Sequence, residues 1–239
     1  MWWALALGLA AAVGNVLGGL FVVHREWPRR YLTDFLALGA GFMLGASLLE
    51  MVPESIRLAG DSALVSVLAG YFLVHLFEHS LVHHFHFGEE THEAEMHARH
   101  ASLSALTGLA VHTFFDGVAI ASAFLVSQWL GVVIFLAIVL HKLPEGFTVS
   151  SLLLAGGGSR RDALAGAALL GGATVAGVAL TGALQSALVY TLPVSAGVTL
   201  YVAASDLIPE VNREHRMSSV FLVFLGVAIL FALHKWFHL

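Results

Sequence analysis

The chain has 239 residues, of which 58% are hydrophobic and only 11% are charged, and its formal net charge is −5. A soluble domain carries about a quarter charged residues, so most of this surface must face lipid, and the few cations exclude a basic surface for nucleic acid. The chain has no cysteine, which excludes disulfides, thiolate metal sites and a thiol nucleophile. Its fourteen histidines are the unusual feature of the composition.

Eight apolar stretches follow one another along the chain, and each is close to the length of about 20 residues that a helix needs to cross a bilayer. They cover roughly residues 1–23, 32–53, 62–83, 101–126, 129–154, 163–187, 190–209 and 217–237. The first stretch lacks the basic region of a cleavable signal peptide, so we expect it to remain as a membrane helix. The sequence therefore predicts an all-α membrane protein with eight transmembrane helices in a single domain, 1–239.

The connections between the stretches predict the orientation, because cytoplasmic connections carry an excess of lysine and arginine. If the N-terminus lies outside, the outer connections hold Arg57 and Lys235, and the inner ones hold Arg25, Arg29, Arg30, Arg99, Arg160, Arg161, Arg213 and Arg216. We therefore expect both termini outside the cytoplasm and a polar loop at about residues 84–100 inside it. The short connections and compact length favour the plasma membrane of a bacterium.

The fourth and fifth stretches place ionisable side chains inside the membrane, where such groups are costly and mark functional sites. HTFFDG contains His112 and Asp116, and HKLPEG contains His141 and Glu145. In each motif the histidine and the carboxylate are four residues apart and share a helix face, and the two antiparallel helices bring both pairs to the same depth. These pairs predict a site at the middle of the bilayer that suits zinc. The alternative is that they only form hydrogen bonds or salt bridges between helices.

The second and seventh stretches end in similar acidic motifs. LLEMVPES contains Glu50 and Glu54, and ASDLIPEV contains Asp206 and Glu210. Because the two helices cross in opposite directions, these ends open on opposite faces, as an inverted repeat of three helices on either side of a central pair would give. We interpret them as the acidic ends of a cation pathway in a 3+2+3 arrangement. The alternative is an ordinary helix end at a proline, with a solvated carboxylate.

Histidines cluster where the third stretch ends and in the polar loop that follows. We interpret this cluster as a cytoplasmic segment that receives or senses metal, the alternative being a solvated loop without a specific role. Its HEAEMH sequence spaces two histidines by five residues, where a zinc protease motif needs four. The histidines of this cluster are His79, His83, His84, His86, His92, His97 and His100.

These motifs resemble the ZIP (Zrt/Irt-like protein) family of divalent metal transporters over nearly the whole chain. HTFFDGVAI resembles the family's fourth-helix motif, HKLPEG resembles its partner in the fifth helix, and the Pro-Glu motifs at Pro53 and Pro209 also match. The resemblance implies a transporter and not an enzyme, which takes up zinc, or cadmium, iron or manganese, into the cytoplasm. It also implies a homodimer, and an elevator-like movement of the first, fourth, fifth and sixth helices against the rest.

The resemblance also implies which residues bind the ion. The family's primary metal site draws on positions that match His112, Asp116, His141 and Glu145, and some bacterial members add a methionine of the second helix. Met43, near mid-depth of the second stretch, is the counterpart. A thioether can ligate soft metals, although a buried methionine is usually core filler.

Two positions depart from the family pattern. Thr113 stands where many members have asparagine, and Lys142 stands where a ligand of a second metal would be. An ammonium group repels a second cation at this distance. We therefore predict a single metal ion, with Lys142 paired to Asp116 or Glu145 in place of the second one.

Two other functions account for part of the pattern. A membrane-embedded zinc hydrolase could use histidine-bound zinc to activate water, but the sequence has neither an HExxH motif nor a nucleophile elbow, and the acidic ends would have no purpose. A metal sensor or a purely structural membrane protein would bind metal that never crosses the bilayer. The sequence favours the transporter over both.

Overall fold

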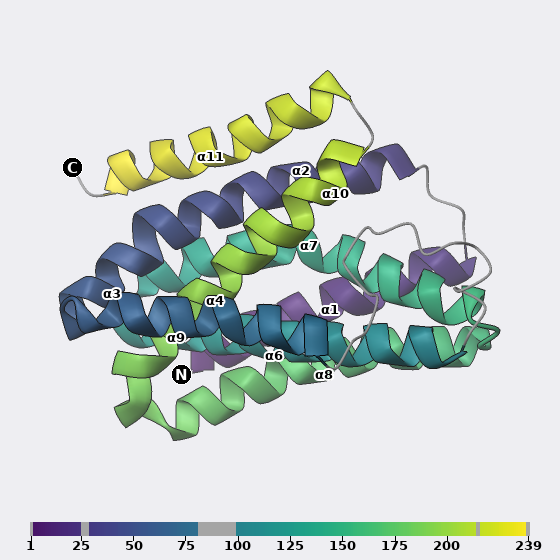
Figure 1. Ribbon diagram of the computed structural model, residues 1–239, viewed down its shortest axis with the longest axis horizontal. Helices are drawn as coiled ribbons and strands as arrows, with labels where there is room; N and C mark the ends of the chain where they lie inside the picture. Colours follow the sequence, from purple (N-terminus) through teal and green to yellow (C-terminus); the bar gives the residue numbers. More distant parts are fainter. Residues whose placement is uncertain (1, 25–28, 81–98, 214–215, 238–239) are drawn as a thin grey trace.

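The structure is a computed structural model that describes residues 2–24, 29–80, 99–213 and 216–237 (Figure 1). Its described residues form helices joined by short turns. In chain order the elements are α1 (Trp2–His24), α2 (Arg29–Ala46), η1 (Ser47–Met51), α3 (Val52–Ala59), α4 (Ser62–Ser80), α6 (Arg99–Val126), α7 (Gln128–Ala155), α8 (Arg160–Ala183), η2 (Gln185–Ala187), α9 (Leu188–Tyr201), η3 (Val202–Leu207), α10 (Ile208–Arg213) and α11 (Met217–Phe237).

Each apolar stretch predicted from the sequence coincides with one helical run of the structure. Two of these runs consist of several pieces: α2, η1 and α3 follow one another without a break, as do α9, η3 and α10. Among the described residues, seven helical runs are long and apolar enough to cross a membrane, and α4 carries a shorter apolar helix, Ser62–Phe77. These lengths confirm the prediction of an all-α membrane protein.

The arrangement of the helix ends agrees with an even number of crossings. The start of α1 and the end of α11 lie at the same end of the bundle (Figure 1). The end of α7 and the start of α8, at Arg160 and Arg161, lie at the opposite end, as do the end of α10 and the start of α11. The arginines at these helix ends, Arg160, Arg161 and Arg213, therefore lie at one end of the bundle. Which side of a cell membrane this end faces stays a prediction.

The helices pack into two groups. In the first, α1 and α6 each pack against both α7 and α8; we call these four helices the four-helix unit. In the second, α2 packs against α11 and α4 packs against α9; with α3 and α10 they form what we call the flanking unit. The two units meet mainly where α2 runs along α7 and where α6 runs along α9.

Glycines bring backbones into contact inside each unit. A Cβ atom on Gly146 of α7 would lie 1.9 Å from the carbonyl oxygen of Asn15 in α1. In the flanking unit, a Cβ on Gly197 of α9 would lie 1.9 Å from the carbonyl oxygen of Val67 in α4. Since real Cβ atoms never approach other atoms so closely, only glycine permits these helix pairs to pack at this distance, as small residues do in membrane helices generally.

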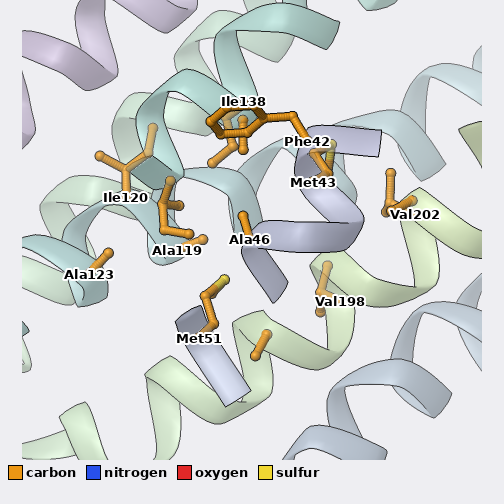
Figure 2. Close-up of a cluster of buried hydrophobic side chains, with 14 of the residues drawn as sticks. Phe42, Met43, Ala46, Met51, Ala119, Ile120, Ala123, Ile138, Val198 and Val202 are labelled. Carbon is orange, nitrogen blue, oxygen red and sulfur yellow. The ribbon is translucent and has the colours of Figure 1, made fainter. Parts of the chain in front are cut away.

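The boundary between the units is packed less closely at its glycine. A Cβ on Gly39 of α2 would lie 3.3 Å from the Cβ of Leu140 and 3.5 Å from the backbone nitrogen of His141 in α7, a tight contact that a shift of a few tenths of an ångström relieves. Figure 2 shows the apolar cluster at this boundary, with contributions from α2, α6, α7, α9 and η3. Its side chains include Phe42, Met43, Ala46, Ala119, Ile120, Ala123, Ile138, Val198 and Val202.

Two π-helical turns occur at matching places in the flanking unit. The turn η1 contains Glu50 and η3 contains Asp206, and in each motif a single residue separates the turn from the Pro-Glu pair. A π turn inserts a residue into the helix, so it rotates the side chains that follow, and such turns are frequent at functional sites. The two acidic motifs therefore share a local backbone irregularity as well as a sequence pattern.

Candidate metal centre

Helices α6 and α7 bring the two predicted histidine–carboxylate pairs together. His112 and Asp116 lie one turn apart on α6, and His141 and Glu145 lie one turn apart on α7. One ligand atom from each of the four residues lies within 4.8 Å of the others, and all four side chains are buried. Because α6 and α7 pack directly against each other, the two pairs meet at one place inside the four-helix unit.

Asp116 lies between the two histidines. Its Oδ2 atom is 3.3 Å from Nε2 of His112 and 3.3 Å from Nε2 of His141. A tetrahedral zinc ion with bonds of about 2.0–2.1 Å keeps its ligand atoms roughly 3.3 Å apart, so this carboxylate oxygen already has a suitable spacing to each imidazole nitrogen. The Nδ1 atom of His141 lies 3.3 Å from the carbonyl oxygen of Ala137, a contact of the kind that orients a metal-binding imidazole.

Lys142 places a positive charge inside this group. Its Nζ atom is 2.6 Å from Oδ2 of Asp116 and 2.6 Å from Oε2 of Glu145, and its side chain is fully buried. The hydroxyl of Thr113 donates to the other oxygen of Glu145. The sequence predicted that Lys142 pairs with Asp116 or Glu145, and the ammonium group contacts both. A bound cation must therefore compete with Lys142 for the same carboxylate oxygens.

Helix α1 supports the segment of α7 that carries the site. A Cβ on Gly14 would lie 3.1 Å from the Cβ of Lys142, and a Cβ on Gly18 would lie 2.2 Å from the carbonyl oxygen of Leu143. Asn15, between these glycines, is fully buried. The sequence analysis missed this role of α1, although an asparagine flanked by glycines in an otherwise apolar stretch is a visible signal.

Met43 lies in the apolar boundary between the units. It is fully buried and belongs to the same cluster as Ile120 of α6 and Ile138 of α7, one turn before His141 (Figure 2). Gly39, one turn earlier on α2, lies beside the backbone of His141. This segment of α2 therefore runs along the site-bearing part of α7, and the use of Met43 as a ligand stays a prediction.

The acidic end of α2 differs from a solvated helix end. Glu50 is buried, and its Oε1 atom lies 2.7 Å from Nδ1 of His234 near the end of α11. Glu54 forms an ion pair with Arg57 at 2.7 Å. His234 was not among the predicted residues, because nothing in the local sequence links it to a carboxylate 184 positions away.

The acidic end in the seventh stretch has a similar division into a buried and a more exposed carboxylate. Asp206 is buried within η3. Glu210 in α10 lies 3.7 Å from Nε of Arg213, and this pair is partly exposed. The contacts described here do not test whether these acidic residues belong to a cation pathway, so that role stays a prediction.

The histidine cluster lies largely outside the described residues. His79 and His100 belong to α4 and α6. The remaining predicted members of the cluster, which fall within the range 81–98 that the structure does not describe, are His83, His84, His86, His92 and His97.

Comparison with known proteins gives related sequences over most of the chain. Residues 88–234 match the family described as ZIP Zinc transporter. The zinc transporter ZIP9-B of Xenopus laevis is 27% identical over 257 aligned residues, which cover 86% of this chain and 84% of the relative. A zinc transporter ZIP13 homolog of Drosophila melanogaster is 31% identical over 131 residues, covering 50% of this chain and 37% of the relative.

Proposed function

Because the chain belongs to the ZIP family of zinc transporters, we propose that it carries a divalent metal ion across a membrane through the site between α6 and α7. The observation that carries the proposal is the convergence of two histidines and two carboxylates within 4.8 Å, all of them buried in a helical membrane protein. Imidazole nitrogen and carboxylate oxygen suit zinc and its borderline neighbours. Zinc is therefore the first expected substrate, followed by cadmium, iron and manganese.

The proposal includes a single ion for each site, because Lys142 already occupies the space between Asp116 and Glu145. With neutral histidines, the ammonium group changes the charge of the empty site from −2 to −1. Each uncompensated charge inside a membrane protein is costly. The smaller net charge therefore lowers the free energy needed to bury the metal-free site. An entering ion takes the carboxylate oxygens, and Lys142 then prevents a second cation from binding beside the first.

We propose further that transport proceeds by movement of the four-helix unit against the flanking unit, the elevator-like mechanism that the family resemblance implies. Two features support this division. Backbone contacts at glycines such as Gly146 and Gly197 hold each unit together, and the boundary is an apolar surface of side chains. The two histidines and two carboxylates of the site all belong to the four-helix unit, so they would move as a group with the ion, whereas Met43 would reach it from α2 of the flanking unit.

The acidic ends and the repeat complete the proposal. Glu50 and Asp206 would mark the two ends of the pathway, since each lies in a π turn at a matching place in the sequence. The same match supports a 3+2+3 arrangement as an inverted repeat. The direction of transport, into the cytoplasm with both termini outside, rests on the distribution of arginine. A bacterial plasma membrane and a homodimer remain expectations of the sequence.

Uptake into liposomes tests the proposal. The purified full chain is reconstituted, and uptake of zinc, cadmium, iron and manganese is compared between the wild type and the variants His141→Ala and Glu145→Ala. We expect zinc uptake that both variants lose. Thr107→Ala is the matched control, because this exposed hydroxyl on α6 only bonds to the carbonyl of Leu103 on its own helix, and it should transport normally.

The contrary result is also clear. If no metal enters the liposomes although zinc binds tightly, and the two variants abolish that binding, the protein is a metal sensor and the proposal is wrong. A titration that finds two tightly bound ions per chain within the membrane region would contradict the single-ion part alone.

A further inference from the structure

A hydrogen bond between two hydroxyl groups crosses the boundary between the units. Ser122, in the last two turns of α6, donates to Oγ1 of Thr191, in the first turn of α9, at 2.9 Å. Ser122 is fully buried. It lies six residues beyond Asp116, or about 9 Å along the helix, in the direction of the end where α6 stops. The bond therefore joins the two units between the metal centre and one end of the bundle.

Other hydroxyl groups that bond to a neighbouring helix, such as Ser47 to Ala196 and Ser150 to Ala163, do so within one unit. A serine or threonine inside a helix can donate to a carbonyl of its own preceding turn. Several residues do so here, each to the carbonyl four positions earlier: Ser55, Thr107, Thr148, Thr174, Thr181 and Ser195. Ser122 instead uses its donor on a neighbouring helix of the other unit.

The same property makes the bond easy to release. If the units separate at this point, Ser122 can turn to the carbonyl of Val118 on its own helix and Thr191 to that of Ala187. Each donor then keeps a partner, so no hydroxyl is left unsatisfied in an apolar boundary. Bonds between membrane helices contribute little net stability for this reason, and removing one shifts an equilibrium by about threefold on average.

We propose that Ser122 and Thr191 are positioning residues that bias the transporter toward the arrangement seen in this structure, by a hydrogen bond that breaks when the four-helix unit moves. This inference rests on the proposed movement of the two units, and it adds the place where they are held. By the predicted orientation, this place lies on the outer side of the metal centre, so the bond holds the outer edges of the units together.

The absence of cysteine from the chain allows a direct test with the double variant Ser122→Cys/Thr191→Cys in proteoliposomes. Two side-chain oxygens 2.9 Å apart keep the two Cβ atoms within about 5.8 Å of each other, and a small approach of the helices brings them to the roughly 3.5–4.5 Å that a disulfide needs. We expect an oxidant to form the disulfide and thereby to abolish zinc uptake. A reductant should then restore uptake. The single variants Ser122→Cys and Thr191→Cys, treated in the same way, should keep their uptake.

Two results would overturn the inference. A disulfide that forms without slowing uptake would mean that the units do not separate here, and a pair that never forms would mean that the residues do not face each other in the membrane. Either result leaves wild-type uptake intact and so differs from a failure of the proposed function, in which the wild type transports no metal.

Substitutions without a cross-link provide an independent measurement. Ser122→Ala and Thr191→Val each remove the hydroxyl while keeping a similar shape. We expect each to change the half-saturating zinc concentration by up to about threefold, and the double variant to change it no further, because both remove the same bond. Effects that multiply in the double variant would contradict the inference.

Discussion

The four-helix unit and the flanking unit are both helical and largely apolar, but their buried charges are arranged in different ways. The four-helix unit gathers three charged side chains and two histidines at one place, His112, Asp116, His141, Lys142 and Glu145, where they contact one another. The flanking unit keeps its buried carboxylates, Glu50 and Asp206, apart in two π turns. The difference fits the proposal that the ion binds in the first unit and passes along the second.

The largest expected effect concerns the charge balance of the four-helix unit. Lys142→Met removes the ammonium group and leaves Asp116 and Glu145 close together without a counterion. Removing one partner of a buried ion pair leaves the other charge uncompensated and costs about 3–5 kcal/mol of stability. The metal-free variant should therefore unfold at a much lower temperature than the wild type. Added zinc should restore much of this loss, because the ion replaces the missing positive charge.

Thermal unfolding in detergent, with and without zinc, measures this effect. Lys235→Met is the matched control, since this lysine is exposed in the last turn of α11 and its loss should leave stability nearly unchanged. Equal stability of the Lys142→Met variant and the wild type without zinc would show that the two carboxylates do not depend on Lys142. The contrast between the two units would then be lost, because the buried carboxylates of the four-helix unit would need no counterion for stability.

A second prediction compares a glycine within a unit with one at the boundary. Gly146→Ala would place a Cβ 1.9 Å from the backbone of Asn15 and force α1 away from α7, at a cost of about 1–3 kcal/mol. Gly39→Ala would place its Cβ 3.3 Å from a side-chain atom of Leu140, which a shift of a few tenths of an ångström accommodates, so its cost to the fold should be smaller. Its added methyl group lies at the surface along which we propose that the units move, and we expect slower zinc uptake.

Unfolding temperatures and uptake rates of the same variants separate the two effects. Gly172→Ala is the control, because no atom lies within 4 Å of its added Cβ and alanine favours the helix slightly. If Gly146→Ala proved stable while Gly39→Ala unfolded the protein, the assignment of α1 and α7 to one rigid unit would be wrong.

The features that were predicted from the sequence are local ones. Hydropathy over about 20 residues locates the helices, and a spacing of four residues places His112 with Asp116 and His141 with Glu145 on one face each. The contact between the two pairs followed from their equal depth in sequential helices. For these reasons the class of fold and the candidate ligands could be inferred without a structure.

The features that escaped the sequence analysis depend on packing between distant segments. His234 lies 184 positions from Glu50, and no periodicity joins them. The role of α1 beside Lys142 depends on glycines whose close approach is visible only once the helices are packed. The π turns also escaped, since a motif such as LLEMVPES reads as an ordinary helix that ends near a proline, while the structure continues the helix through an inserted residue.

The smallest expected effect concerns the acidic end of the flanking unit. Glu50→Gln keeps the size of the side chain and its capacity to bond to His234 but removes its charge. If Glu50 draws cations toward the pathway, the variant should need a severalfold higher zinc concentration for half-maximal uptake, with little change in the maximal rate. Because screening weakens such attraction at a distance, the difference from the wild type should shrink at high salt.

Glu54→Gln is the matched control, since Glu54 is already neutralised by its ion pair with Arg57 at 2.7 Å and should have a smaller effect. An unchanged half-saturating concentration for Glu50→Gln at low salt, together with a lower unfolding temperature, would mean that the Glu50–His234 contact only fastens α11 to α2. The flanking unit would then contribute a surface for movement, and the attraction of the ion would have to come from the four-helix unit alone, where Asp116 and Glu145 leave a net negative charge beside Lys142.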